Sequence, residues 1–407
     1  MCSQMSKMII YGQALLKGFP FKAFTRDIWL ICLSNIIGAF GEGLYFWVFP
    51  IYIRTLQADY IQLGLVFSAL FGASALAPLP GGLLADRFDR KKILILAWIP
   101  WVLSPLVYSF ASDWTQLIPG AIFWGISMIG VPAANSYIIT SVVDKTKLAS
   151  VLSFVWSCYS FSYIFAPTVG GYLAAVIGMR WVLRVSALLT AVATVVFLFL
   201  RSQHPNKGER TFQELTSSNE EKKLWHTLLL WSAFFAAVTF FMSVGRTFVQ
   251  TFLDEVVGLN EFYIGLFGSI NFAGITFIGI AMGRLGDKWK KSGALSVCLL
   301  LYVVSIVPMF MIRETSVLMF VAFLFGGSAV TGSLVSSFVG TIAPENKRGL
   351  WVSIPQTLSL SAAFVAPYLA GYLYTLKPEY AFIFSVSALP ILMVFALAKL
   401  KERSWKS

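Results

Sequence analysis

Two charged residues stand out in this sequence because each lies deep within a long apolar stretch. Glu42 is the only acid of 19 in such a position, and Arg246 is the only base among 31 Lys and Arg residues. A charge at the centre of a bilayer costs about 2.5–3.5 kcal/mol on insertion scales, so residues of this kind usually line a cavity. A buried carboxylate can bind a proton or a cation, and a buried guanidinium can bind an anion or pair with the carboxylate.

The elements that must position these residues are twelve apolar runs. Of the 407 residues, 57% are hydrophobic and 12% are charged, whereas a soluble domain is about one-quarter charged. Each run is long enough for a helix to cross a hydrocarbon core about 30 Å thick. The runs cover residues 28–53, 61–84, 93–111, 115–140, 150–177, 180–200, 225–253, 261–282, 293–312, 315–342, 351–376 and 380–398. They lack the period-2 alternation of barrel strands, so we expect an all-α membrane protein with twelve transmembrane helices.

The basic residues are distributed unequally between the two sides of the membrane. With the N-terminus inside, both termini and the loops on their side carry 25 of the 31 Lys and Arg, and the opposite side carries five. This asymmetry is what the positive-inside rule predicts. The net charge of +12 therefore indicates topology, with both termini cytoplasmic in a plasma-membrane protein, and does not indicate nucleic-acid binding.

The cysteines and histidines form no pattern typical of a metal site or a disulfide framework. Cys2, Cys32, Cys158 and Cys298 are scattered, and the two histidines flank the central loop. The sequence contains no GxxxxGK[ST] phosphate loop, no HExxH and no clear Ser-His-Asp set. We therefore expect no cofactor, no metal and no enzymatic activity. A membrane-embedded enzyme or sensor is the rival class, and acids and histidines gathered at one membrane face would favour it.

A charged segment between two apolar runs recurs in the second half of the chain. GGLLADRFDRKK (81–92) is matched by GRLGDKWKK (283–291) at an offset of 201 residues, and APTVGGYL (166–173) is matched by APYLAGYL (366–373) at an offset of 200. The same offset of 201 aligns Gly64 with Gly265 and Gly125 with Gly326. Collinear matches of this kind predict a duplication. The predicted units are an N-terminal segment (1–27), a six-helix bundle (28–200), a cytoplasmic linker (201–224), a second six-helix bundle (225–398) and a cytoplasmic tail (399–407).

Two six-span halves with this charged loop resemble the major facilitator superfamily. The family loop has the pattern G-x-L-x-D-R-x-G-R-K, and the segment from Gly82 to Lys91 matches it except that Asp89 replaces a glycine. The resemblance implies two pseudo-symmetric bundles around a central cavity. It also implies a latch in which Asp86 contacts the start of span 11, and Asp287 that of span 5, in the outward-open state. The expected latch residues are Gly82, Asp86, Arg87, Arg90, Gly283, Asp287 and Lys288.

The fifth apolar run contains an element that resembles one found in the drug–proton antiporters of this superfamily. SYIFAPTVGG (162–171) shares Pro167, Gly170 and Gly171 with the G-x3-G-P-x2-G-G pattern, and its two leading glycines are replaced by Ser162 and Ala166. Small residues allow helices to approach closely, so ordinary tight packing between helices is the alternative interpretation.

Within this resemblance, Glu42 and Arg246 could face each other across a cavity lined by spans 1, 4, 7 and 10. We expect Glu42 to bind the transported proton and Arg246 to influence it; a permanent salt bridge that only fixes packing, or a neutral, hydrogen-bonded Glu42, is the alternative. The remaining expected cavity residues are Asn35, Tyr45, Trp47, Trp124, Asn135, Tyr137, Gln250 and Gln356.

The sequence thus predicts a monomeric secondary transporter that works by alternating access in the lipid bilayer. Aromatic faces with a lone carboxylate suit lipophilic or cationic small molecules, so proton-coupled efflux is the favoured function. Import of a small anionic or neutral nutrient is the alternative, because a cavity arginine can hold a carboxylate or phosphate.

Overall fold

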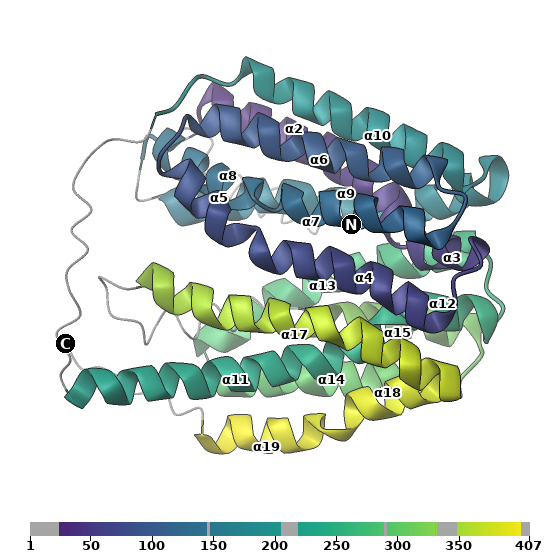
Figure 1. Ribbon diagram of the computed structural model, residues 1–407. Helices are drawn as coiled ribbons and strands as arrows, with labels where there is room; N and C mark the ends of the chain where they lie inside the picture. The colour runs from purple at the N-terminus through teal and green to yellow at the C-terminus, as the bar shows by residue number, and fades with distance from the viewer. Residues whose placement is uncertain are drawn as a thin grey trace, which may run out of the picture.

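A computed structural model describes residues 24–144, 147–204, 219–288, 291–329, 331 and 348–399. All regular secondary structure in these ranges is helical (Figure 1). Ten segments are long and apolar enough to cross a membrane, and Thr315–Ser328 is a shorter apolar helix. The predicted all-α class is therefore confirmed for the described residues. The predicted tail and nearly all of the N-terminal segment lie outside the described residues, as do 205–218 of the predicted linker.

The helices of the first half follow the predicted runs in order. They are α2 (Arg26–Phe46), α3 (Phe49–Thr55), α4 (Tyr60–Leu76), α5 (Pro78–Ala85), α6 (Arg90–Phe110), α7 (Leu117–Ser127), α8 (Gly130–Ser141), α9 (Leu148–Ile177) and α10 (Met179–Val196), with short 3-10 turns η2 (Trp114–Gln116) and η4 (Phe197–Phe199).

The described residues of the second half also form a series of helices. They are α11 (Asn219–Thr247), α12 (Val249–Glu255), α13 (Glu261–Lys288), α14 (Lys291–Met311), α15 (Thr315–Ser328), α17 (Arg348–Leu376), α18 (Pro378–Ser387) and α19 (Leu389–Lys399).

Several runs that the sequence predicts as single helices are interrupted. The first run divides into α2 and α3, and the second divides into α4 and α5, with a proline at the N-terminus of the second helix in each case. The last run divides into α18 and α19, where Pro390 is the second residue of α19. Proline has no N–H to donate to the preceding turn but fits the first turn of a new helix, which explains why these runs are interrupted there.

The two halves meet along two pairs of helices. Within the first half, α2 packs between α9 and α10, and α6 packs on α7 and α10. Within the second half, α11 packs on α17 and α18, and α14 packs on α15 and α19. The pairs α4–α17 and α9–α13 connect the halves, and Figure 1 shows α4 beside α17.

The contacts of these two pairs are equivalent under the sequence offset. A Cβ added to Gly64 on α4 would lie 2.3 Å from the carbonyl oxygen of Pro367, and a Cβ added to Gly265 on α13 would lie 2.2 Å from that of Pro167. Glycine is therefore required at both positions for the helices to approach so closely. The aligned residues identified in the sequence thus make the same contacts in each half.

Two short helices mark one end of the molecule. Helix α3 packs on α12 there, and Arg54 on α3 forms an ion pair with Glu255 on α12. We call this the Arg54 end. The opposite end, where α5 is followed by α6, contains Arg90, and we call it the Arg90 end.

Candidate functional site

Glu42 lies on α2 within the glycine-rich stretch GAFGEG (38–43). A Cβ added to Gly38 would lie only 2.4 Å from the ring of Trp101 on α6. Glycine at this position therefore allows the Trp101 indole to pack directly against the backbone of α2, one helical turn from Glu42.

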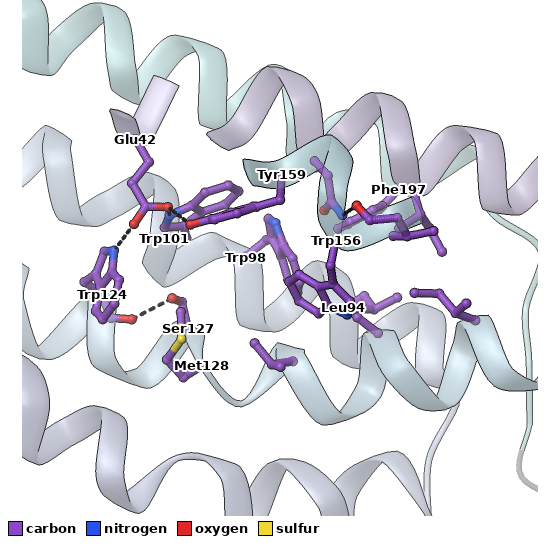
Figure 2. A pocket seen from close by; sticks show the side chains of 16 residues that line it. Glu42, Leu94, Trp98, Trp101, Trp124, Ser127, Met128, Trp156, Tyr159 and Phe197 are labelled. Atoms are coloured by element: carbon purple, nitrogen blue, oxygen red, sulfur yellow. Dashed lines mark hydrogen bonds between the residues drawn. The ribbon is translucent and has the colours of Figure 1, made fainter. Parts of the chain in front are cut away.

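Glu42 is buried, with only 2% of the residue exposed. Its carboxylate nevertheless accepts three hydrogen bonds. Trp124 donates its Nε1–H to Oε1 at 2.8 Å, Tyr159 donates its hydroxyl to Oε2 at 2.8 Å, and Trp101 donates its Nε1–H to Oε2 at 3.2 Å. Figure 2 shows these groups converging on the carboxylate from α6, α7 and α9. Hydrogen bonds to an ionised group are stronger than neutral ones, so this set compensates for much of the lost hydration.

A cavity of about 240 Å³ adjoins Glu42 and is predominantly aromatic and aliphatic (Figure 2). Its lining residues all belong to the first half of the chain. They are Ile31, Asn35, Glu42, Leu94, Trp98, Trp101, Trp124, Ser127, Met128, Val131, Ala134, Ile138, Val155, Trp156, Tyr159 and Phe197.

The donors around Glu42 differ in what they can do when the carboxyl group gains a proton. An indole N–H only donates, whereas a phenol hydroxyl donates or accepts. The hydroxyl of Tyr159 also lies 3.4 Å from that of Tyr163. Tyr159 can therefore accept a hydrogen bond from a neutral Glu42 and turn its own hydrogen toward Tyr163, so the network suits both states of the carboxyl group.

The surroundings of Glu42 are suited to a cation. No basic side chain of the described residues lies within ion-pair distance of Glu42. Aromatic faces attract cations through their quadrupole, and the cavity presents four tryptophans and Tyr159 beside one carboxylate. A flat or bulky organic cation could therefore find a counter-ion and an apolar surface in the same cavity.

Arg246 does not pair with Glu42 in this conformation. Its Nη2 donates to Oγ of Ser328, and its guanidinium lies 4.9 Å from the ring centroid of Phe325 and 5.9 Å from that of Tyr302. These partners belong to α14 and α15 in the second half. The permanent Glu42–Arg246 salt bridge considered from the sequence is absent here, because each residue has its own set of partners.

The aromatic settings of the two charged residues correspond to each other. The offset of 201 residues that relates the halves places Trp101 on Tyr302 and Trp124 on Phe325. In the first half this aromatic pair holds a carboxylate, and in the second half it holds a guanidinium. Equivalent aromatic positions thus contact opposite charges in the two halves, but the charged residues themselves are not equivalent, since the offset places Glu42 on Ser243 and Arg246 on Tyr45.

Only two of the other predicted cavity residues line the cavity beside Glu42. They are Trp124 and Asn35, which also donates to the carbonyl oxygen of Val155 at 3.2 Å. The others lie elsewhere. Tyr45 packs on Phe49 and Tyr108, Trp47 stacks on Phe267, Asn135 accepts a hydrogen bond from Trp156, Tyr137 donates to the carbonyl oxygen of Arg201, Gln250 has a buried Oε1 without a hydrogen-bond partner, and Gln356 is exposed.

The charged loop between α5 and α6 is held to the chain that follows η4. Asp89 stands at the position where the family loop pattern has glycine. It caps α6 by accepting a hydrogen bond from the Lys91 N–H at 3.0 Å, and it also accepts one from the Gln203 N–H at 3.1 Å. Arg90 donates to Thr140 Oγ1 at 2.6 Å and to Gln203 Oε1 at 2.9 Å. The loop therefore fixes the start of the predicted linker.

Other expected latch residues are only partly described. Asp86 is the C-cap of α5, and Arg87 is exposed. Within the described part of the chain, a Cβ added to Gly82 would meet nothing within 4 Å. Gly283, Asp287 and Lys288 lie in α13, but their side chains are outside the described part of the structure, as is the start of α17 that Asp86 is expected to contact.

The span 5 element packs tightly on both sides. A Cβ added to Gly170 would clash with the backbone of Leu44 on α2, and one added to Gly171 would lie 2.2 Å from the carbonyl oxygen of Glu261 on α13. Pro167 lies opposite Gly265 in the same contact. These residues bring α9 close to both α2 and α13, as tight packing requires.

Comparison with known sequences decides the family. The sequence pattern described as Major Facilitator Superfamily matches residues 31–270 and 238–406. The chain belongs to the major facilitator superfamily. The resemblance inferred from the charged loop and the repeat is therefore confirmed, and so is its coarser consequence, a multi-span membrane transporter.

Relatives in this superfamily include proteins named for drug resistance. Multidrug resistance protein 2 of Bacillus subtilis (strain 168) is 25% identical over 375 residues, which cover 88% of this chain and 92% of that protein. Quinolone resistance protein NorA of Staphylococcus aureus (strain COL) is 21% identical over 392 residues, which cover 93% and 100%. Similarity to these proteins agrees with the drug–proton antiporter branch.

Solved structures of other superfamily members share the fold. The nucleoside transporter NupG superposes with a TM-score of 0.73 at 12% identity, covering 93% of this chain and all of that one. A POT family transporter in complex with 5-aminolevulinic acid superposes with a TM-score of 0.74 at 14% identity, covering 95% and 99%. At these identities the likeness establishes the fold and not the substrate.

The sequence did not reveal the other groups that hold Glu42. Trp101 and Tyr159 are two of its three hydrogen-bond donors. Trp98 and Trp156 line the adjoining cavity. All four lie in spans rich in aromatic residues, where packing and lipid contact are the usual roles. The offset of 201, which places Trp101 on Tyr302, was the one available signal.

Proposed function

We propose that this superfamily member is a secondary transporter that works by alternating access, with twelve spans in two six-helix bundles of 28–200 and 225–398. The equivalent contacts Gly64–Pro367 and Gly265–Pro167 support this arrangement, since a rotation that exchanges the halves would exchange the two contacts. Parallel repeats of this kind let the halves rock about a site between them.

The conformation supports an assignment of the two ends. The halves contact each other through α3 and α12 at the Arg54 end. The basic loops, including the one with Arg90, belong to the opposite end, which the positive-inside rule assigns to the cytoplasm. We therefore interpret this conformation as closed toward the outside, with both termini in the cytoplasm.

The latch contacts expected for Asp86 and Asp287 belong to the opposite state, in which the Arg90 end is closed. The space around Gly82 agrees with this assignment, because no described residue lies within 4 Å of a Cβ added there. We propose that the two halves close on this loop when the Arg54 end opens, and that Asp86 then stabilises the closed cytoplasmic end.

The observation that carries the substrate proposal is the unpaired, buried carboxylate of Glu42 within an aromatic cavity. Three neutral donors hold it, so no protein cation must be displaced when a substrate cation approaches. A proton and an organic cation would compete for the same carboxylate, and this competition is a sufficient basis for exchange. We infer proton-coupled efflux of lipophilic cations, and export of a drug would agree with the resistance for which two relatives are named.

A second candidate is import of an anionic or neutral nutrient. The nucleoside and POT family structures share the fold, and Arg246 has no carboxylate partner among the described residues. A guanidinium of this kind can bind a carboxylate or phosphate. Arg246 is nevertheless already held by Ser328, Phe325 and Tyr302, which favours the first candidate.

Reconstitution into liposomes with an imposed pH gradient tests this proposal. Lipophilic cationic dyes and tetraphenylphosphonium should move against the direction of proton flow, and anionic nutrients should not. Glu42→Gln should abolish coupling. The control is Asp113→Asn, which changes an exposed acid between α6 and α7 and should leave coupling unchanged. Transport of anionic nutrients alone, or full coupling in Glu42→Gln, would contradict the proposal.

A further inference from the structure

A second hollow lies at the Arg54 end, away from Glu42. It has a volume of about 560 Å³ and is formed by α3, the end of α9, the beginning of α10 and the first residue of α13. We call it the Arg180 groove. Its lining residues are Val48, Ile51, Tyr52, Thr55, Ala174, Ile177, Gly178, Met179, Arg180, Trp181, Arg184 and Glu261.

Two arginines of α10 contribute positive charge to the Arg180 groove. Arg180 and Arg184 are one helical turn apart and so lie on the same face. Arg180 donates Nη2 to the carbonyl oxygen of Ala111 at 3.1 Å, and the Arg184 guanidinium lies 4.6 Å from the Trp181 ring. Neither forms an ion pair with any acid of the described ranges. Arg180 also contacts the Tyr52 hydroxyl, and the N–H groups of the two arginines beyond these contacts are available to a bound anion.

A carboxylate from the other half of the chain completes the groove. Glu261 is the first residue of α13 and forms no ion pair with a described residue. Its backbone is fixed against α9, because a Cβ at Gly171 would lie 2.2 Å from the Glu261 carbonyl oxygen. The groove thus presents two guanidinium groups on one wall and one carboxylate on another.

The surroundings of the groove place it at the level of lipid headgroups. Trp181 and Phe110 are large, apolar and 56% and 66% exposed, respectively, and Val176 and Ile177 beside them are exposed as well. In a multi-span protein such side chains face lipid, and Trp and Arg at the ends of spans lie at the membrane interface. A ligand in this groove could thus enter sideways from the bilayer.

We propose that the Arg180 groove binds phosphatidylethanolamine from the leaflet at the Arg54 end. Arg180 and Arg184 hold the phosphate, and Glu261 accepts hydrogen bonds from the ammonium group. Phosphatidylcholine carries the same charges, but its quaternary ammonium has no N–H to donate. Its phosphate can therefore bind Arg180 and Arg184, but its headgroup forms no hydrogen bond with Glu261.

Binding of this lipid would also favour one state of the transporter. The arginines belong to α10 and the carboxylate to α13, and α9 packs on both of these helices. A ligand that bridges them binds the present state better than a state opened at the Arg54 end. By linkage, the lipid stabilises closure of this end.

Native mass spectrometry of the full-length protein, purified from vesicles with equal amounts of phosphatidylethanolamine and phosphatidylcholine, tests the inference. Wild type should retain phosphatidylethanolamine preferentially. Arg184→Ala and, separately, Arg180→Ala should reduce its retention about fivefold, as expected for one cation near a membrane surface. Glu261→Gln should keep phospholipid but lose the preference. Lys377→Ala, which removes a cation at the same end outside the groove, should have no effect.

The source of the headgroup is tested with soluble phosphoethanolamine. It should fail to displace the retained lipid at millimolar concentration, because it lacks the acyl chains that lie against the apolar residues. Equal retention of both lipids by wild type, unchanged retention in both arginine variants, or displacement by phosphoethanolamine would overturn the inference. Because lipid retention is measured without transport, these outcomes are independent of the proposed efflux.

Discussion

Nε of Arg54 lies 2.6 Å from Oε1 of Glu255, and the two residues are separated by 201 positions. This separation equals the offset that relates the halves of the sequence, so an ion pair joins two equivalent positions. Oε2 of Glu255 also accepts a hydrogen bond from the Tyr60 hydroxyl at 2.8 Å, and the Arg54 guanidinium lies 4.2 Å from the Tyr60 ring. These three residues connect α3 and α4 to α12 at the Arg54 end.

Removing this ion pair should populate states open at the Arg54 end. Both side chains are about one-quarter exposed, and an exposed pair contributes at most about 1 kcal/mol, so Arg54→Gln should shift the equilibrium by roughly fivefold. Distances between spin labels on α3 and α12 measure the shift. The double variant Arg54→Glu with Glu255→Arg, which exchanges the two charges, should restore the wild-type distances. A distance distribution that Arg54→Gln leaves unchanged would show that the ion pair does not hold this end closed.

Trp124→Phe should shift the pH dependence of transport. The variant keeps an aromatic ring in the cavity but lacks the N–H that donates to Oε1 of Glu42. An indole donor stabilises the ionised carboxylate more than the neutral carboxyl group, because a hydrogen bond to a charged group contributes about 1.5–3 kcal/mol. The pH midpoint of dye exchange in proteoliposomes should therefore move upward. The control is Trp156→Phe, which changes another tryptophan of the same cavity that does not donate to Glu42. A midpoint in Trp124→Phe identical to that of wild type would argue against this role of Trp124.

Effects of variants at Glu42 and Arg246 on the stability of the protein should be additive. The two residues have separate partners in separate halves, and sites without shared contacts usually add within about 0.5 kcal/mol. Thermal unfolding of Glu42→Gln, Arg246→Gln and the double variant in detergent measures the coupling. A coupling energy above about 1 kcal/mol would indicate a direct interaction that this conformation lacks.

Asp89 should make the stability of the protein depend on pH in the acid range. Burial raises the pKa of its carboxyl group, but hydrogen bonds from the Gln203 and Lys91 N–H groups outweigh this effect, and the pKa is lowered. The folded pKa therefore lies below the unfolded value of about 3.9, so the contribution is complete above that value and is lost as the pH falls through the folded pKa.

Two substitutions separate this charge from its capping role. Asp89→Ala should lower stability by about 1 kcal/mol through the lost N-cap. Asp89→Asn keeps a good capping residue and should flatten the acid dependence below about pH 4. Thermal unfolding between pH 3 and pH 7 measures both effects. Parallel pH profiles for wild type and Asp89→Asn would contradict the assignment.

The sequence predicted the class of fold from its apolar runs because lipid requires helices of a definite length. It could not locate the interruptions within them: Pro50, Pro78 and Pro390 begin new helices, whereas Pro167 lies inside the continuous α9. Proline is compatible with either outcome, and the packing around each one decides. The repeat was more informative, since aligned glycines proved to make equivalent contacts.

The candidate site was predictable only at its charged residue. Glu42 was identified because a carboxylate in an apolar run is costly, and this cost is visible in the sequence. Arg246 was identified for the same reason, but composition carries no information on whether two such residues meet. Their separation follows from packing, since Arg246 lies among Tyr302, Phe325 and Ser328 of its own half.

Proton release on substrate binding is the most direct test of the exchange at Glu42. Addition of tetraphenylphosphonium to the purified, weakly buffered protein near its transport midpoint, where about half of the Glu42 side chains are protonated, should release about half a proton for each bound cation, and Glu42→Gln should release none. Release that persists in Glu42→Gln, or cation binding by wild type without any release, would contradict the account.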